Sequence, residues 1–365
     1  MQDHRTHSTT DDSVKRHFTP AICLLFLSCV TAPTPSSDRG QAIAHYDKAV
    51  GFYAQEQYQD AVEEYQLAVQ DWPNYTEAHF GLGASFIKTG FYRGAVIALR
   101  RAIDLKPECP EAYANLGLAE AAVGRPADAA ASLRQAVDQD PDLWSAWISL
   151  GRVYCTLGQI EDSLDAYREA VTGMPYHAHI ALASHYKSTG DLERLISHLR
   201  AAAAADSTRP EPWSDLGNAY QSRGDFLDSR EAYLIAIDRS VGASPQVVRK
   251  LADVYAASGE FSEAARLYGE VLAEAPDDAA LHYNLAVAYD SLGRHDEAIA
   301  SYRRAIELDV GFVDGYLYLA TALIGNRRLS EALDAYDAYL LCAEEGDRRY
   351  QVEVLAQKLR AALGR

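Results

Sequence analysis

The sequence predicts an all-α fold, a solenoid of short helices stacked in consecutive pairs. Residues 282–309 carry two stretches with small and apolar side chains at helical spacing. Gly293 lies between them, where the first helix must end in a left-handed turn. The same pattern recurs along the chain in steps of about 34 residues. A pair of helices this short cannot bury its apolar faces alone, so neighbouring pairs must stack.

Residues 1–40 are predicted to be a leader that precedes the helical repeats. Lys15 and Arg16 are followed by an apolar run over residues 21–30, a combination that is typical of a secretory signal and too short to span a bilayer. Residues 31–40 are rich in proline, serine and threonine, which favours an extended tether.

Cys29 is the candidate for a lipid anchor. Residues 26–29 resemble the lipobox of bacterial lipoproteins, in which the cysteine becomes the lipidated first residue of the mature chain. This resemblance implies a location in the cell envelope, on the periplasmic side, with membrane contact only through the leader. The alternatives are secretion after cleavage near Ala32 and an uncleaved hydrophobic segment, with a secreted or cytoplasmic chain. Val14 precedes the basic pair, and we hypothesise that translation starts there.

Nine helical repeats are predicted between residues 42 and 345. At repeat position 8 every unit has glycine or alanine, and at position 20 eight of the nine units have a small residue. Small side chains allow paired helices to approach closely where they cross. The units start near Ala42, Thr76, Pro110, Trp144, Tyr176, Pro210, Pro245, Ala279 and Val313.

The fifth unit departs from the pattern, because it starts two residues early and has Leu195 at position 20. This departure predicts either a joint in the middle of the array or an irregular repeat without consequence. After the ninth unit, residues 347–364 predict an amphipathic helix that caps the array, as the end of a solenoid requires. The expected packing face of this helix holds Val354, Leu355, Leu359 and Leu363.

The repeats resemble those of the tetratricopeptide repeat family over about five-sixths of the chain. The resemblance implies a right-handed superhelix in which the first helices of the pairs line a concave groove for peptide segments or partner helices. An alternative for the aromatic residues of the first two units is packing against neighbouring helices. Carried over position by position, the resemblance gives as groove residues Tyr46, Val50, Tyr53, Phe80, Ile87, Leu118, Arg152, Asn218, Tyr283, Val287 and Leu317.

Two recognition devices of this family are not expected in this chain. Asn284 falls at the repeat position used by the carboxylate clamp for chaperone tails. However, Asp253 stands where the preceding unit needs asparagine, and Asp314 and Tyr318 stand where the next unit needs cations. Asn115 and Asn284 are too few for the asparagine ladder of O-linked N-acetylglucosamine transferases.

Composition and motifs argue against several classes of function. The net charge of −18 argues against nucleic-acid binding, which needs a basic surface. The sequence has no glycine-rich phosphate loop, zinc-protease motif or nucleophile elbow, so we expect no enzymatic activity and no cofactor. His177 and His179 are two residues apart and cannot share a helix face, so we interpret these histidines as packing residues rather than metal ligands.

The sequence therefore predicts a non-catalytic scaffold for protein–protein interactions, with proteins or peptides as partners. Its expected role is the assembly of envelope, secretion or pilus components. The alternative is a subunit that recruits substrates to an enzyme such as a glycosyltransferase, whose catalytic part is on another chain.

Overall fold

The computed structural model describes residues 38–242, 244–309 and 311–364. Residues 1–37 of the predicted leader, with Val14 and Cys29, lie outside these residues. Arg39 and Gly40 were predicted to end the extended tether, but they are the first two residues of a helix that Asp38 caps. Every regular element within them is an α-helix, and there are 19 such helices. None of the described helices is both long and apolar enough to cross a membrane. The predicted all-α class is confirmed.

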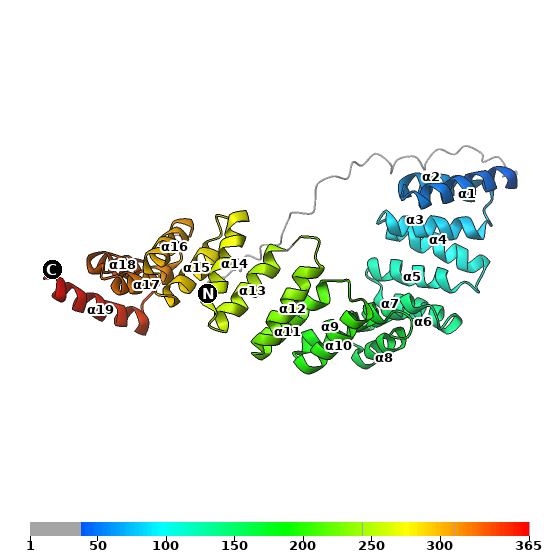
Figure 1. Cartoon of the computed structure of the whole chain (residues 1–365). Helices are drawn as coiled ribbons and strands as arrows, with labels where there is room; N and C mark the ends of the chain where they lie inside the picture. The colour runs from blue at the N-terminus through cyan, green and yellow to red at the C-terminus, as the bar shows by residue number, and fades with distance from the viewer. Residues whose placement is uncertain (1–37, 243, 310, 365) are drawn as a thin grey trace, which may run out of the picture. The chain divides into compact units, whose positions relative to one another are not determined.

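The chain divides between Phe91 and Tyr92 into two compact units. The first unit contains α1 (Arg39–Ala54), α2 (Tyr58–Asp71) and α3 (Thr76–Lys88). The second unit, labelled in Figure 1, contains α4 (Tyr92–Leu105), α5 (Pro110–Ala122), α6 (Pro126–Gln139), α7 (Trp144–Thr156), α8 (Ile160–Ala170), α9 (Pro175–Thr189), α10 (Leu192–Ala205), α11 (Glu211–Arg223), α12 (Phe226–Arg239), α13 (Pro245–Ala257), α14 (Phe261–Glu274), α15 (Ala279–Ser291), α16 (His295–Leu308), α17 (Val313–Gly325), α18 (Leu329–Cys342) and α19 (Asp347–Leu363).

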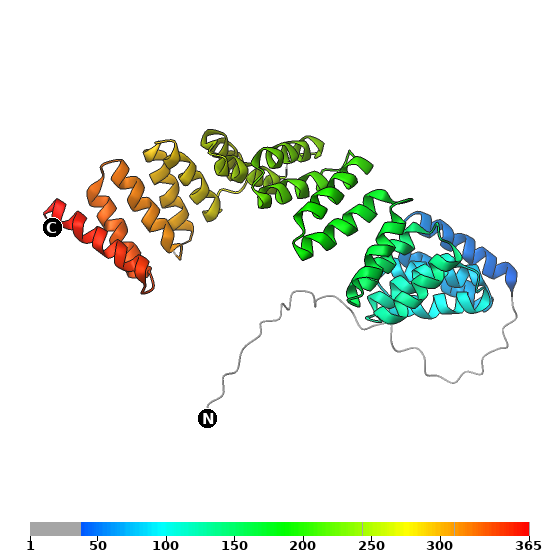
Figure 2. The same cartoon turned by 90° about the horizontal axis from the view of Figure 1, so that it is seen from below.

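Within each unit, helices that follow one another in sequence pack side by side. In the first unit α1 packs on α2, and α2 packs on α3. From α4 to α19 each helix packs on the next, and alternate helices also touch at α5–α7, α7–α9 and α11–α13 (Figures 1 and 2). Contacts between neighbours in sequence are the property of a solenoid, so the second unit is an array of helix pairs and not a globule with one centre.

The small residues of repeat positions 8 and 20 lie at the helix crossings. All nine residues at position 20 are buried, including Leu195. At position 8, a Cβ atom added to Gly151 would lie 2.5 Å from Cε1 of Tyr167, and one added to Gly217 would lie 2.6 Å from Cε1 of Tyr233. Glycine is therefore needed at these crossings because the ring of the paired helix fills the space of a side chain.

The turns between paired helices need a left-handed residue, as Gly293 with φ 71° illustrates. Two turns achieve this without glycine, at Glu56 with φ 61° and Arg327 with φ 58°. A non-glycine residue in this conformation costs about 1 kcal/mol.

The array is irregular between α8 and α9. Helix α8 has 11 residues, whereas the equivalent helices α6 and α10 have 14. Within the described residues, no side-chain hydrogen bond or ion pair joins α7 or α8 to α9 or α10. The next junction is different, because Arg223 of α11 pairs with Glu193 of α10 at 2.8 Å. The junction of α8 with α9 is therefore held by apolar packing.

The capping helix α19 packs with a different face from the one predicted. Val352 and Ala356 are buried, and Leu359 and Leu363 pack against the same cluster. Leu355 is 44% exposed, so its placement on the packing face was wrong. Polar contacts accompany this packing near both ends of the helix, because Arg349 donates to the carbonyl of Ala343 and Arg360 pairs with Asp337 of α18.

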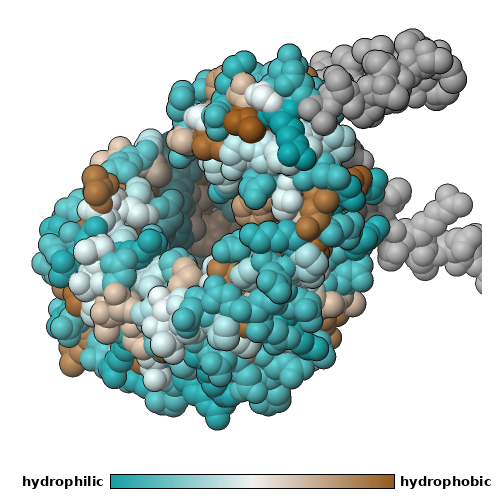
Figure 3. All heavy atoms as spheres, turned by 90° about the vertical axis from the view of Figure 1, so that its right-hand side faces the viewer, coloured by the Kyte–Doolittle hydropathy of each residue, from teal (hydrophilic) through white to brown (hydrophobic). Residues whose placement is uncertain are grey.

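Hydrophilic residues cover most of the face drawn in Figure 3, as a net charge of −18 leads one to expect. Exposed large apolar side chains are spread over several helices, for example Ile97 on α4, Leu227 on α12 and Leu341 on α18. Single exposed apolar residues of this kind are common on protein surfaces. The hollows between helices therefore indicate a functional site more clearly than these scattered apolar side chains do.

Candidate functional site

A cavity of about 710 Å³ opens between α7, α8 and α9. Pockets of about 300–1,000 Å³ are large enough to hold several side chains of a ligand. The apolar and aromatic lining comes from all three helices, and hydroxyl, imidazole, thiol and guanidinium groups complete it. The lining residues are Ile148, Arg152, Cys155, Thr156, Ile160, Tyr167, His177, Ile180, Ala181, Ser184, His185 and Ser188.

A second cavity of about 390 Å³ lies between α9, α10 and α11. Ile180 and Ser184 of α9 line both cavities, so the two adjoin, and we call them together the central groove. The remaining lining of the second cavity is Ala183, Lys187, Leu192, Leu195, Leu199, Asp215, Asn218, Ala219 and Ser222.

The central groove has few carboxylates for so acidic a chain. Its one acidic lining residue, Asp215, lies 3.6 Å from the ammonium group of Lys187. Among the residues that the structure describes, the guanidinium group of Arg152 has no hydrogen-bond or ion-pair partner. The groove therefore offers an apolar lining and an unused cation to a ligand.

The structure brings two of the predicted groove residues, Arg152 and Asn218, into the central groove. The amide group of Asn218 already has partners, because its Oδ1 accepts a hydrogen bond from Tyr233 at 2.9 Å and its Nδ2 donates to the carbonyl of Ser214 at 3.0 Å. Burial raises the pKa of the Tyr233 hydroxyl, so this hydroxyl remains a donor. Arg152 is therefore the predicted residue most available to a ligand.

Two of the predicted groove residues of the first unit, Tyr46 and Tyr53, contact aromatic side chains of the same unit. The ring of Tyr46 is 5.0 Å from that of Tyr75 and 5.7 Å from that of Tyr65, and burial raises the pKa of Tyr65 to about 12. Tyr53 makes an edge-to-face contact with Tyr58 at 5.2 Å. Packing against neighbours thus accounts for much of the surface of both predicted tyrosines. Val50 is 43% exposed, and the side chains of Phe80 and Ile87 are half-buried.

The other predicted residues lie away from the central groove. Leu118 is on α5 and is exposed. Tyr283 and Val287 of α15 and Leu317 of α17 pack against the core formed by α15 to α19. The ring of Tyr283 lies 5.0 Å from Phe312 and 5.2 Å from Tyr318. A ligand-binding role for these four residues remains a prediction.

Most of the central groove was not predicted from the sequence. Ile148, Ile160, Cys155 and His185 line it although they were not selected as groove residues. The early start of the fifth unit was the one available signal, because this irregularity falls at the junction of α8 with α9, where the cavity lies.

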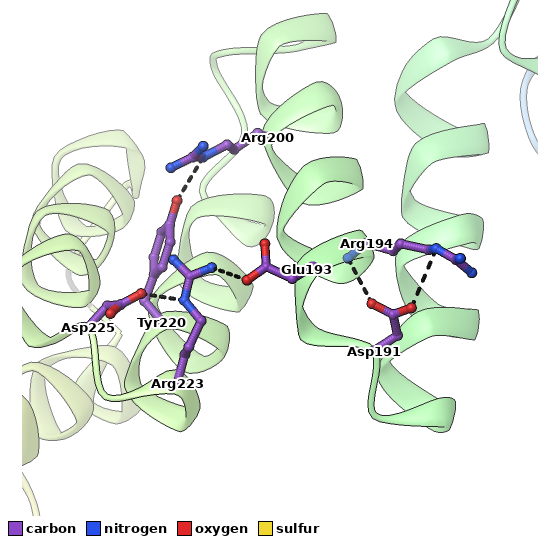
Figure 4. A network of polar contacts seen from close by, with 7 residues as sticks. All are labelled: Asp191, Glu193, Arg194, Arg200, Tyr220, Arg223 and Asp225. Atoms are coloured by element: carbon purple, nitrogen blue, oxygen red, sulfur yellow. Dashed lines mark hydrogen bonds and ion pairs between the residues drawn. The ribbon is translucent and has the colours of Figure 1, made fainter.

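Polar contacts join α10 and α11, two of the helices that line the second cavity (Figure 4). Arg223 pairs with Glu193 and with Asp225, and Nε of Arg200 donates to the hydroxyl of Tyr220 at 2.7 Å. Exposed ion pairs contribute about 1 kcal/mol or less each. Their effect is to hold α11 in register with α10.

The histidines of α9 and α10 make packing contacts. Nδ1 of His179 lies 3.1 Å from Nδ1 of His198, and the ring of His198 stacks on Tyr186 at 5.4 Å. In other units the same slot holds Trp147, which donates to the carbonyl of Pro141, and His282, which is bonded to that of Pro276. The described residues contain no group of three or more potential metal ligands.

This histidine pair predicts a pH dependence of stability. Burial lowers the pKa of both His179 and His198, and the nearby charge of Arg168 on α8 lowers that of His198 further. The folded chain therefore binds fewer protons than the unfolded chain, in which these pKa values are about 6.5. Stability should be unaffected by this pair above about pH 6.5 and should fall as the pH drops below that value.

Urea denaturation between about pH 7.5 and about pH 5.5 should show this fall. The double variant His179→Gln/His198→Gln should lose part of this fall in stability at low pH, whereas the exposed control His177→Gln should keep it. If the free energy of unfolding depended on pH identically in the double variant and the parent, the prediction would be contradicted.

The stacked helix pairs and the central groove are the features of a helical-repeat binding protein. Tetratricopeptide repeat profiles match residues 80–143, 116–178 and 249–311, and a further TPR repeat profile matches residues 52–90. Together they match just over half of the chain. The chain belongs to the tetratricopeptide repeat family.

Similar proteins share parts of this chain. The protein CTR9 homolog of Arabidopsis thaliana is 26% identical over 180 residues, which are 48% of this chain and 16% of that protein. The Hsp70-Hsp90 organising protein of Plasmodium falciparum is 31% identical over 91 residues, which are 25% of this chain and 36% of that protein. The chain thus spans well under half the length of these relatives. MamA from Desulfovibrio magneticus RS-1 has a TM-score of 0.45 and 18% identity, with 47% of this chain and 96% of that chain covered.

Proposed function

We propose that this chain is a non-catalytic scaffold that binds a segment of another polypeptide in the central groove. The observation that carries the proposal is the pair of adjoining cavities along α7, α9 and α11, together with Arg152, whose guanidinium group has no partner among the described residues. Membership of the tetratricopeptide repeat family supports it, and one relative is named for organising two other proteins.

The groove chemistry suits a polypeptide ligand. Isoleucine and alanine side chains can bury apolar groups of a peptide, at about 25 cal/mol per Å² of apolar surface. The hydroxyl groups of Ser184 and Ser188 can donate hydrogen bonds to its carbonyl groups. Such a combination supplies affinity through burial and orientation through a few polar contacts.

The proposal does not include the carboxylate clamp for chaperone tails. Arg249 pairs with Asp278 at 3.1 Å, and Nδ2 of Asn284 lies 3.4 Å from Asp253. Arg249 and Asn284 therefore serve contacts between repeats. The similarity to an Hsp70-Hsp90 organising protein therefore supports the repeat architecture and not the same ligand.

We also propose that the scaffold is held in the cell envelope through Cys29 and assembles envelope, secretion or pilus components there. The apolar run before Cys29 and the tether after it support this location. Membrane fractionation of cells that express the full chain tests it. The parent should be found with the membranes and Cys29→Ser should be released from them, and equal distribution of the two would contradict the anchor.

Site-specific photo-crosslinking in the full chain tests the groove. A photoreactive phenylalanine at Ser184 would lie in the central groove, and the same residue at Asp165 of α8, where the side chain is 70% exposed, is the control. We expect polypeptide crosslinks from position 184 and few from position 165. Crosslinks from position 165 alone would place the binding surface elsewhere.

A further inference from the structure

The cavity between α7, α8 and α9 is lined by no aspartate or glutamate. The chain has 52 acidic residues against 34 basic residues, so a lining of this size without a carboxylate is notable. The charged side chain in this lining is Arg152, and within the described part of the chain its guanidinium group has no partner. Most other arginines of the second unit do have partners, for example Arg168, which lies 2.6 Å from Asp165.

The geometry around Arg152 combines this cation with an apolar recess. Ile148 lies one helical turn before Arg152 on α7, and Ile160 of α8 and Ile180 of α9 line the same cavity. The recess lies where α7, α8 and α9 meet, and α8 is three residues shorter than α6. A ligand that fills this recess therefore places its neighbouring groups near the guanidinium group.

We propose that this cavity receives a bulky apolar side chain of the partner segment, and that a glutamate or aspartate next to that side chain pairs with Arg152. The proposal rests on the proposed function, because it names the chemistry of the segment bound in the central groove. Arg152 stands at repeat position 9 of the fourth unit, where the chaperone-tail clamp has asparagine, so it supplies a cation that the clamp does not have at this position.

The electrostatics favour an acidic segment in spite of the net charge of −18. A guanidinium group can donate two parallel hydrogen bonds to one carboxylate, and these charge-assisted bonds are about twice as strong as neutral ones. Repulsion by carboxylates elsewhere on the surface is screened over about 8 Å at physiological ionic strength. The local pair with Arg152 therefore dominates over the distant acidic residues.

Three labelled peptides with the full chain test the proposal by fluorescence anisotropy. All three contain the same Phe-Leu pair, and they differ only in flanking residues, which are glutamate, glutamine or lysine. The glutamate peptide should bind most tightly. Arg152→Glu should weaken its binding by about tenfold or more, and Arg152→Gln should weaken it less.

The control is Arg168→Glu, which makes the same charge change on the same repeat outside the cavity and should change binding less than about twofold. Alkylation of Cys155, followed by mass spectrometry, reports occupancy of the cavity, and the glutamate peptide should slow it.

Equal binding of the glutamine and glutamate peptides, with Cys155 protected in both cases, would overturn the acidic preference and leave the groove as a binding site. Equal losses for Arg152→Glu and Arg168→Glu would also overturn it. Failure of all three peptides to protect Cys155 would overturn both this inference and the assignment of the groove. The melting temperature of each variant shows whether its fold is intact.

Discussion

Replacing Arg100 with methionine should lower the free energy of unfolding by about 3 kcal/mol. The side chain of Glu120 on α5 is 2% exposed, and its carboxylate accepts hydrogen bonds from Nη2 of Arg100 and from Oγ of Ser132, each at 2.7 Å. Without Arg100 the buried carboxylate keeps the bond from Ser132 but loses its charge partner. Urea denaturation followed by circular dichroism measures the change.

A matched background distinguishes this explanation from simple loss of packing. The position of Glu120 in its repeat is occupied by tyrosine in other units, where Arg134 contacts Tyr154 and Arg200 contacts Tyr220. In the variant Glu120→Tyr, the further change Arg100→Met should cost about 1 kcal/mol, the value of one neutral hydrogen bond. Equal costs in the two backgrounds would show that the buried charge is not the cause.

The repeat architecture could be predicted because it depends on local features. Small residues at fixed intervals mark where helices cross, and these positions are buried in the structure, as at Ala61, Ala298 and Ala332. Glu120 did not stand out, because a glutamate on a helix usually faces water. Its burial depends on Arg100, which lies 20 residues away and on another helix.

The candidate site could be predicted only in part. Arg152 and Asn218 were found through their repeat positions, which are set within one helix. The cavity depends instead on how α7, α8 and α9 pack together, which no single repeat position determines. The packing face of α19 likewise follows from its contacts with the preceding helices, so the sequence pattern placed Leu355 wrongly on that face.

Replacing Gly151 with leucine should lower the free energy of unfolding by about 1–3 kcal/mol. A Cβ atom at this position would lie 2.5 Å from the ring of Tyr167, which is 3% exposed and would have to shift. Leucine is a better helix former than glycine by about 0.8 kcal/mol, so any net loss must come from the crowded crossing. The midpoint of urea denaturation measures the balance.

Gly269 of α14 provides the control, because a Cβ atom added there meets no atom within 4 Å. Gly269→Leu keeps the gain in helix propensity without the clash, so it should leave stability unchanged or raise it by up to about 0.8 kcal/mol. Stability changes of opposite sign at these two helical glycines would distinguish the effect of packing from that of helix propensity. If Gly151→Leu were as stable as the parent, α7 and α8 could separate at this crossing without cost, and close approach at position 8 would not hold the repeats together.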